Sequence, residues 1–562
     1  MSNKANTMNY KHYVKIPEVN LPNRQWPNKV IDKAPIWCSV DLRDGNQALE
    51  VPMNMEQKLK FFDFLVNKIG FKTIEIGFPA ASETDYNFCR ELIDNNLIPD
   101  DVAIQVLTQS REHIIEKTME AVYGAKNVVI HLYNSTSTLQ RDVVFGFDRQ
   151  QCIDLAVEGA KMIKKYIDED ESETNWILEY SPESYSSTEP DFAVEICDAV
   201  CDVWQPTPEK KVIMNLPETV EYTLPNVYAD MVEYFCTNTK WRDCMEVSLH
   251  THNDRGTGVA ASELGMLAGA DRVEGTLFGN GERTGNVDII TLAINMLMHG
   301  VDPELDFSNI NECVDVYEDL CGMTVGPRHP WAGKLVFTAF SGSHQDAINK
   351  GKKKMAERNS DIWAVPYLPI DPADVGRAYE PIVRINSQSG RGGIAFVLEQ
   401  SYGVQLPKSF QKDFLKVVKD YTDHNEMELM PAQVFQLFDD NYINVYSPYM
   451  LVNFQEHSIG KKNSEVTAVI SHNGVDEEIN GVGKGLLDAF VNAFSNHTGV
   501  KFSINMYNEH ALKSGTDSAA ITYIEIKRES DGQIFLGAGV SSSVTKSSVR
   551  AIISAYNRMI KE

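Results

Sequence analysis

The chain has 562 residues, a 43% apolar fraction and a formal net charge of -27, which predict a globular protein of several domains. The acidic balance argues against binding to nucleic acid or to anionic membranes, because such binding needs clustered Lys and Arg. No apolar run could span a bilayer, no secretory signal is evident, and the nine cysteines include no Cys-x-x-Cys pair. We therefore expect reduced thiols and a cytoplasmic location.

Eight short runs rich in Val and Ile alternate with amphipathic helical patterns in the first half of the chain. The runs are IWCSVDL (36–42), TIEIGF (73–78), AIQVLT (103–108), NVVIHLY (127–133), WILEYS (176–181), KVIMNL (211–216), EVSLHTH (246–252) and RVEGTLF (272–278). Eight strand-helix units in about 270 residues are typical of a (β/α)8 TIM barrel, and periodicity alone leaves a doubly wound open sheet as the alternative. We predict the barrel over residues 31–305, after an N-terminal arm over residues 1–30.

The alternation stops beyond residue 305, where a helical, charge-rich stretch begins. We predict helical linker subdomains over residues 306–424. The last part repeats one pattern: a hairpin with a tight turn at Asn473-Gly474 or Asp531-Gly532, then a Gly-x-Gly, then a helix. This predicts a separate α+β domain over residues 425–562, built from two βββα-like repeats.

Polar residues follow the ends of the predicted barrel strands, which is where such barrels carry their chemistry. His250 and His252, in SLHTHND (248–254), are two residues apart in one strand and therefore point the same way. Two imidazoles can be half of a metal site, although such a pair can also lie on a solvated strand face. Asp44 would stand beside them when the barrel closes, and Asn286 could add a neutral oxygen; a loop cap and a turn residue are their structural alternatives. These four residues predict a site for Mg2+, Mn2+ or Zn2+.

Four further residues at the same strand ends could act around a polarised carbonyl group. Arg43 could hold a developing oxyanion, or form a surface ion pair instead. Glu183 could orient or relay a proton, or cap the loop after Pro182. Thr219 and His131 could bind a substrate carboxylate, or pack within the polar layers of the barrel.

Three motifs of the barrel carry a family resemblance when they are taken together. LRDGNQ (42–47), SLHTHND (248–254) and GNGERTGN (279–286) resemble the acyl-CoA condensing and cleaving barrels. That family includes 2-isopropylmalate, homocitrate and citramalate synthases and hydroxymethylglutaryl-CoA lyase. A divalent metal, Mg2+ before Mn2+ or Zn2+, is the cofactor that this resemblance implies.

Motifs beyond the barrel narrow the resemblance to the 2-isopropylmalate synthase branch. They are SGSHQDA (341–347), VPYLPIDP (365–372) and INSQSGRGG (385–393), and the similarity begins at PNRQWPNK (22–29) and runs to the C-terminus. The resemblance implies a Claisen-type condensation of acetyl-CoA with 3-methyl-2-oxobutanoate. Hydrolysis of the thioester would then give 2-isopropylmalate and CoA, the first committed step of leucine biosynthesis.

The resemblance also implies roles for particular residues. Asp44, His250, His252 and Asn286 would hold the metal that polarises the keto group. His344 and Tyr367, in the subdomains that complete the active site, would reach the barrel from the partner subunit of a homodimer. They would take part in removing the acetyl methyl proton, with help from Glu183 and Arg43. The resemblance does not specify which of these groups accepts the proton.

The C-terminal repeat resembles the leucine-sensing domain of the same family, so we expect leucine inhibition. Gly481, Gly483, Gly537 and Gly539 could present backbone N–H groups to the leucine carboxylate, or could simply be turns into helices. Lys484-Gly485 stands at a position where many members of the family have proline. The rival interpretations are homocitrate or citramalate synthase on the same scaffold, a barrel metallohydrolase, and a non-catalytic leucine sensor.

Overall fold

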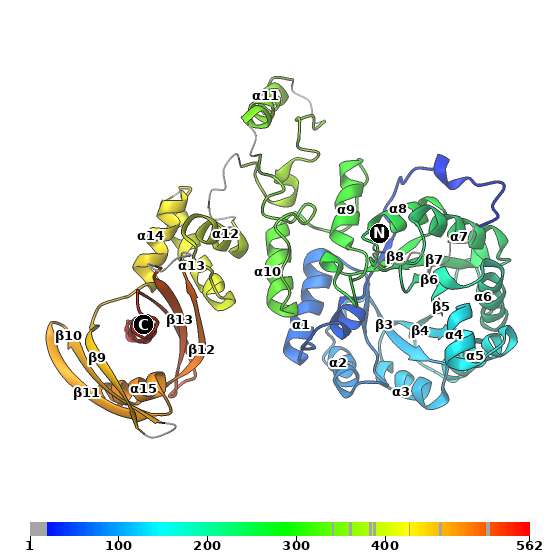
Figure 1. Ribbon diagram of the computed structural model, residues 1–562. Coiled ribbons are helices and arrows are strands. Elements are labelled where there is room, and N and C mark those ends of the chain that lie inside the picture. The colour runs from blue at the N-terminus through cyan, green and yellow to red at the C-terminus, as the bar shows by residue number, and fades with distance from the viewer. Residues whose placement is uncertain are drawn as a thin grey trace, which may run out of the picture. The chain divides into compact units, whose positions relative to one another are not determined.

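The computed structural model divides the chain into two compact units, Met1–Gly333 and Lys334–Glu562, and each is described by itself (Figure 1). The described residues are 19–339, 342–358, 362–380, 385, 389–425, 427–459, 463–512 and 518–561. Within these ranges, none of the helices combines the length and the apolar composition that crossing a bilayer requires.

The first unit is a closed barrel of eight parallel strands, each hydrogen-bonded to the next and β1 paired with β8. The strands are β1 (Ile36–Ser39), β2 (Thr73–Gly77), β3 (Ala103–Gln109), β4 (Asn127–Ser135), β5 (Asn175–Glu183), β6 (Val212–Glu218), β7 (Met245–Thr251) and β8 (Arg272–Gly275). Every one of the eight predicted runs overlaps one of these strands. The TIM barrel is therefore confirmed, and the open sheet is excluded because Cys38 in β1 pairs with both Thr73 and Glu274.

Helices surround the barrel (Figure 1), and most of the residues that they bury are apolar. They are α1 (Met55–Phe64), α2 (Glu83–Asp94), α3 (Glu112–Val122), α5 (Arg149–Asp168), α6 (Pro190–Trp204), α7 (Pro225–Asn238), α8 (Gly258–Leu267) and α9 (Ile289–Met298), and α10 (Ile310–Cys321) follows them. Local sequence fixes several helix starts. Asn54 and Gln57 form a capping box at α1, and Asp148 and Gln151 form one at α5.

The second unit begins with four helices, which are α11 (Gly342–Arg358), α12 (Arg391–Tyr402), α13 (Lys408–Asn425) and α14 (Pro431–Tyr442). Two three-stranded antiparallel sheets follow, each completed by one helix. The first repeat is β9 (Tyr449–Ile459), β10 (Asn463–His472), β11 (Val475–Gly483) and α15 (Leu486–Thr498). The second is β12 (Phe502–Ala511), β13 (Ala520–Arg528), β14 (Ile534–Ser541) and α16 (Val544–Met559). The predicted pair of βββα repeats is thus confirmed.

The predicted tight turns occur where the hairpins need them. Asn473 and Gly474 both adopt positive φ angles, of 51° and 89°, between β10 and β11. Such a turn matches the right-handed twist of the flanking strands. Phe490 and Phe494 of α15 share one buried core with Ile552 and Tyr556 of α16, so the two repeats are stabilised together.

The four predicted regulatory glycines lie in the strands that precede the helices, Gly481 and Gly483 at the C-terminal end of β11, and Gly537 and Gly539 within β14. A Cβ atom at Gly481 or Gly483 would stand 2.5 Å from the Ala489 carbonyl oxygen or 2.3 Å from the Ala489 nitrogen. At Gly537 it would stand 2.1 Å from the Ala555 nitrogen, and at Gly539 2.0 Å from the Ser547 oxygen. Each Gly-x-Gly therefore lets a strand pack directly on the backbone of the helix that follows it.

We expect Gly537→Val to destabilise the C-terminal domain by roughly 2 kcal/mol or more, because its side chain must displace the backbone of α16. Denaturant unfolding followed by circular dichroism measures the change. Gly326→Val is the control, since a Cβ atom there meets nothing within 4 Å. Equal unfolding midpoints for the two variants would contradict the close strand-helix packing.

Candidate active site

The C-terminal ends of the barrel strands surround a cavity of about 190 Å³. Seven of the eight barrel residues predicted from the sequence line it: Arg43, Asp44, His131, Glu183, Thr219, His250 and His252. Ser181 and Asn215, which the sequence did not single out, line it too. The eighth predicted residue, Asn286, is buried beside His252, with which it forms an isolated backbone bridge.

The chain leaves β1 through a π-helical turn, Asp41–Gly45, which brings Arg43 and Asp44 to the cavity. Asp41 fixes this turn, because its carboxylate accepts hydrogen bonds from the Ser39 hydroxyl at 2.8 Å and from the Leu277 backbone N–H at 3.0 Å. Burial raises the pKa of Asp41 to about 7. The end of β1 is thereby tied to the end of β8.

Asp44, His250 and His252 are buried together, and their possible ligand atoms lie within 4.8 Å of one another. The Asp44 Oδ2 atom is 3.2 Å from His250 Nε2 and 3.6 Å from His252 Nε2. Asn286 donates its Nδ2–H to the Asn280 carbonyl at 3.0 Å, which leaves its buried Oδ1 without a hydrogen-bond partner. Two imidazoles, a carboxylate and an unsatisfied amide oxygen are a donor set that fits a divalent cation.

The three clustered residues have shifted pKa values. Burial alone would raise the pKa of Asp44, but Arg43 and His250 hold it well below its usual range. Burial opposes a charge on His250, yet Asp44 and Glu274 raise its pKa to about 9. Burial and the neighbouring His250 lower the pKa of His252 to about 4. In the absence of metal, His250 is therefore protonated at neutral pH and His252 is not.

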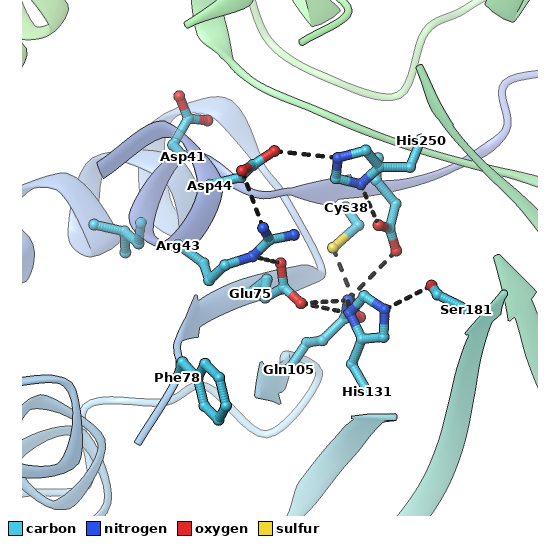
Figure 2. Close-up of polar contacts among 12 residues, drawn as sticks. Cys38, Asp41, Arg43, Asp44, Glu75, Phe78, Gln105, His131, Ser181 and His250 are labelled. Atoms are coloured by element: carbon cyan, nitrogen blue, oxygen red, sulfur yellow. Dashed lines mark hydrogen bonds and ion pairs between the residues drawn. The ribbon is translucent and has the colours of Figure 1, made fainter. Parts of the chain in front are cut away.

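Glu75 links two predicted residues and was missed by the sequence prediction (Figure 2). Its Oε2 accepts from Arg43 Nε at 2.5 Å, and its Oε1 accepts from His131 Nδ1 at 2.6 Å. The other ring nitrogen of His131 accepts from the Ser181 hydroxyl at 2.7 Å. Arg43 also contacts Asp44, with 3.0 Å between Nη1 and Oδ1. One buried carboxylate thus orients a guanidinium group and an imidazole that both face the cavity.

A second missed group, Glu274 of β8, continues these contacts on the other side of β1. His250 donates its Nδ1–H to Glu274 Oε2 at 2.8 Å. Asn215 donates its Nδ2–H to the same oxygen at 3.2 Å and to Ser181 Oγ at 3.0 Å. Arg272, which is 1% exposed, forms an ion pair with Glu274 from below. The sequence signal for this pair was two charged residues at positions i and i+2 of a predicted barrel strand.

Glu183 and Thr219 lie at the ends of β5 and β6, on the rim of the cavity. The Glu183 carboxylate accepts a hydrogen bond from the Ser135 hydroxyl. The Thr219 hydroxyl accepts from the Ser184 backbone N–H at 2.9 Å. Both side chains therefore have fixed positions near the predicted site.

His344 and Tyr367 belong to the second unit, where they stack with their ring centroids 4.1 Å apart and their planes at 24°. Tyr367 is 61% exposed and has a positive φ of 64°, and His344 is exposed too. Ser341 and residues 386–388, within two of the family motifs, are outside the described residues. The structure thus brings together the two predicted residues that lie outside the barrel.

Comparison with known proteins defines the class of this barrel and then its branch. The HMGL-like family model matches residues 34–316. The model described as "Alpha-isopropylmalate synthase, post-catalytic domain-like" matches residues 334–399, and the LeuA allosteric (dimerisation) domain matches residues 428–560. Among solved structures, hydroxymethylglutaryl-CoA lyase from Pseudomonas aeruginosa has a TM-score of 0.44 at 15% identity, covering 54% of this chain and 97% of its own.

Two curated relatives extend the match to nearly the whole chain. The 2-isopropylmalate synthase of Clostridium acetobutylicum is 55% identical over 559 residues, which are 98% of this chain and 99% of that relative. The 2-isopropylmalate synthase of Acetoanaerobium sticklandii is 55% identical over 555 residues, 98% of this chain and 97% of that relative. The chain therefore belongs to the 2-isopropylmalate synthase family of enzymes. The family prediction is confirmed, and these relatives do not favour the rival interpretations.

We expect the affinity of the site for Mn2+ or Mg2+ to rise about tenfold per pH unit between pH 7 and pH 8. The raised pKa of His250, about 9, means that a cation must displace one proton from this imidazole below pH 9. Isothermal titration in buffers with different ionisation enthalpies counts the proton released. An affinity that does not change between pH 7 and pH 9 would contradict this exchange.

Proposed function

We propose that this chain condenses acetyl-CoA with 3-methyl-2-oxobutanoate and hydrolyses the thioester, giving 2-isopropylmalate and CoA. The observation that carries the proposal is the grouping of Asp44, His250 and His252 beside Arg43 in one cavity at the barrel mouth. This cavity lies in a chain that is related over nearly its full length to 2-isopropylmalate synthases. The substrates are proposed from the family and from the chemistry of these side chains.

Asp44, His250, His252 and Asn286 would hold the divalent metal, with Mg2+ as the first candidate and Mn2+ or Zn2+ as alternatives. When bound, the cation would supply Lewis-acid polarisation of the keto group. Arg43 would donate hydrogen bonds to the oxyanion that develops on this group, because Glu75 and Asp44 already hold its guanidinium at the cavity. His131 and Thr219 would bind and orient the carboxylate of the oxo acid.

His344 and Tyr367 would remove the proton from the acetyl methyl group, with Glu183 assisting. Their stacking and exposure support this role, since an exposed pair can meet the substrate of another chain. We propose that the partner subunit of a homodimer presents them to the barrel. The match to the LeuA allosteric (dimerisation) domain supports a dimer.

The C-terminal domain would bind leucine and lower activity as feedback control. Its match to the LeuA allosteric domain supports this proposal, and Gly481, Gly483, Gly537 and Gly539 lie where strands β11 and β14 pack on its helices. The close strand-helix packing at these glycines would carry a change at the leucine site through the shared core of both repeats. A leucine titration of the full-length enzyme tests this control.

We expect the full-length enzyme to release CoA fastest with 3-methyl-2-oxobutanoate when pyruvate and 2-oxoglutarate are compared in parallel. The reaction should need a divalent cation, so a chelator should abolish it and added Mg2+ or Mn2+ should restore it. A thiol-reactive dye follows the CoA. Preference for another oxo acid would move the function to a sister synthase, and no release from folded, metal-loaded protein would overturn the proposal.

We expect His344→Ala to lower kcat at least about 100-fold without changing the metal affinity. Heterodimers of one His344→Ala chain and one Asp44→Ala chain test whether the site is shared. If the partner supplies His344, one of the two sites is intact, and the heterodimer should regain about half of the wild-type turnover. Heterodimers no more active than the single variants would mean that His344 acts within its own chain.

A further inference from the structure

Glu274 lies at the floor of the barrel mouth and outside the proposed set of metal ligands. It belongs to β8, its side chain is fully buried, and its Oε2 atom accepts the Nδ1–H of His250 at 2.8 Å. The opposite ring nitrogen, His250 Nε2, faces Asp44 Oδ2 at 3.2 Å. Glu274 therefore contacts the one nitrogen of His250 that points away from the proposed cation site.

This contact decides which nitrogen of His250 is available as a ligand. A neutral imidazole carries its proton on either nitrogen, and a carboxylate at one of them holds the proton there. Once a cation displaces the second proton of His250, Glu274 holds the remaining proton at Nδ1, and the lone pair lies at Nε2, beside Asp44. A carboxylate behind a ligating histidine also raises its basicity and fixes the plane of its ring.

Glu274 is itself held from both of its oxygens. Arg272 forms an ion pair with Oε1, and Gln105 Nε2 is 3.4 Å from the same atom. Asn215 donates to Oε2 at 3.2 Å. Arg272 is anchored in turn, because it donates to Gln105 Oε1 at 2.7 Å and to Ser248 Oγ at 3.0 Å.

Glu179 offers a matched comparison within the same layer of the barrel. Its side chain is as completely buried as that of Glu274, and Arg272 donates to its Oε2 at 3.1 Å. Within the described part of the chain, Glu179 forms no hydrogen bond or ion pair with His250; it faces His131 instead, with 3.3 Å between Oε1 and Nε2. The two glutamates thus share one arginine and differ in which histidine they face.

We infer that Glu274 is a positioning residue that fixes the tautomer and the ring orientation of His250 toward the metal, and that Arg272 holds Glu274 in place. The inference rests on the proposed function. A purely structural role does not require this arrangement, because burying an ion pair carries a desolvation cost that apolar side chains would avoid.

We expect Glu274→Gln to weaken Mn2+ binding about 10-fold to 100-fold, measured by isothermal titration of the full-length protein. Glu179→Gln, which removes a carboxylate from the same arginine, should change the Mn2+ affinity by less than about threefold. Glu274→Asp keeps the charge but withdraws it from His250 Nδ1 by one methylene group, so it should bind Mn2+ more tightly than Glu274→Gln and more weakly than wild type. Thermal unfolding in chelator shows whether each variant is folded, and Glu274→Asp carries the test if Glu274→Gln is not.

The outcomes separate this inference from the function on which it rests. Wild-type protein that binds no Mn2+ would overturn both. Wild-type binding with an unchanged affinity in folded Glu274→Gln, or in Glu274→Asp where that variant carries the test, would overturn the inference alone. Equal losses in the Glu274→Gln and Glu179→Gln variants would overturn it as well, because they would reflect a general disturbance of the barrel floor.

Discussion

A closed ring of hydrogen bonds and ion pairs across the barrel mouth is the constraint on which the site depends, and Figure 2 shows its part from Ser181 through His131, Glu75, Arg43 and Asp44 to His250. It passes in order through Arg43, Glu75, His131, Ser181, Asn215, Glu274, His250 and Asp44, and returns to Arg43. A buried polar group without a partner costs free energy, so turning any member of the ring leaves a neighbour unsatisfied. The members of the ring come from seven of the eight barrel strands or from the turns that directly follow them. The ring therefore also fixes the relative positions of the strand ends. The groups that face the cavity are thereby oriented before a ligand arrives.

Positive and negative side chains balance each other below the cavity, and one of the positive charges is a proton on His250 that a cation can replace. Arg43 and Arg272 are positive, and Asp44, Glu75 and Glu274 are negative because both arginines and the histidines keep the pKa values of these carboxylates low. Burial and the charge on Glu274 raise the pKa of Glu179, and the protonated His250 supplies a third positive charge against these three carboxylates. Exchange of that proton for a divalent cation adds one net positive charge. The carboxylate of a 2-oxo acid would neutralise it, so the electrostatics of the floor favour an anionic substrate once the cation is present.

The sequence predicted the barrel because both of its signals are local, namely short apolar runs and the polar residues that follow them. It placed Arg43, Asp44 and the two histidines of β7 in one cavity because strand order determines which loops become neighbours. It missed Glu75 and Glu274, since a charged residue inside a barrel strand faces either the interior or the helices, and only closure of the barrel decides between them. The glycines of the C-terminal repeats were read as possible ligands for a carboxylate. Their close contact with α15 and α16 depends on tertiary packing that no local pattern contains.

The ring also limits which residue can remove a proton from a substrate. Of the imidazoles that line the described cavity, His131 has both nitrogens engaged, by Glu75 and by Ser181. His250 is held between Glu274 and Asp44, and His252 shares the cluster that fits a cation. A barrel mouth organised in this way can polarise and orient a substrate, but its own imidazoles are already engaged in the ring or in the metal-ligand cluster. His344 and Tyr367 stack on each other and are exposed in the second unit, and for this reason the proposed function assigns the removal of the proton to them.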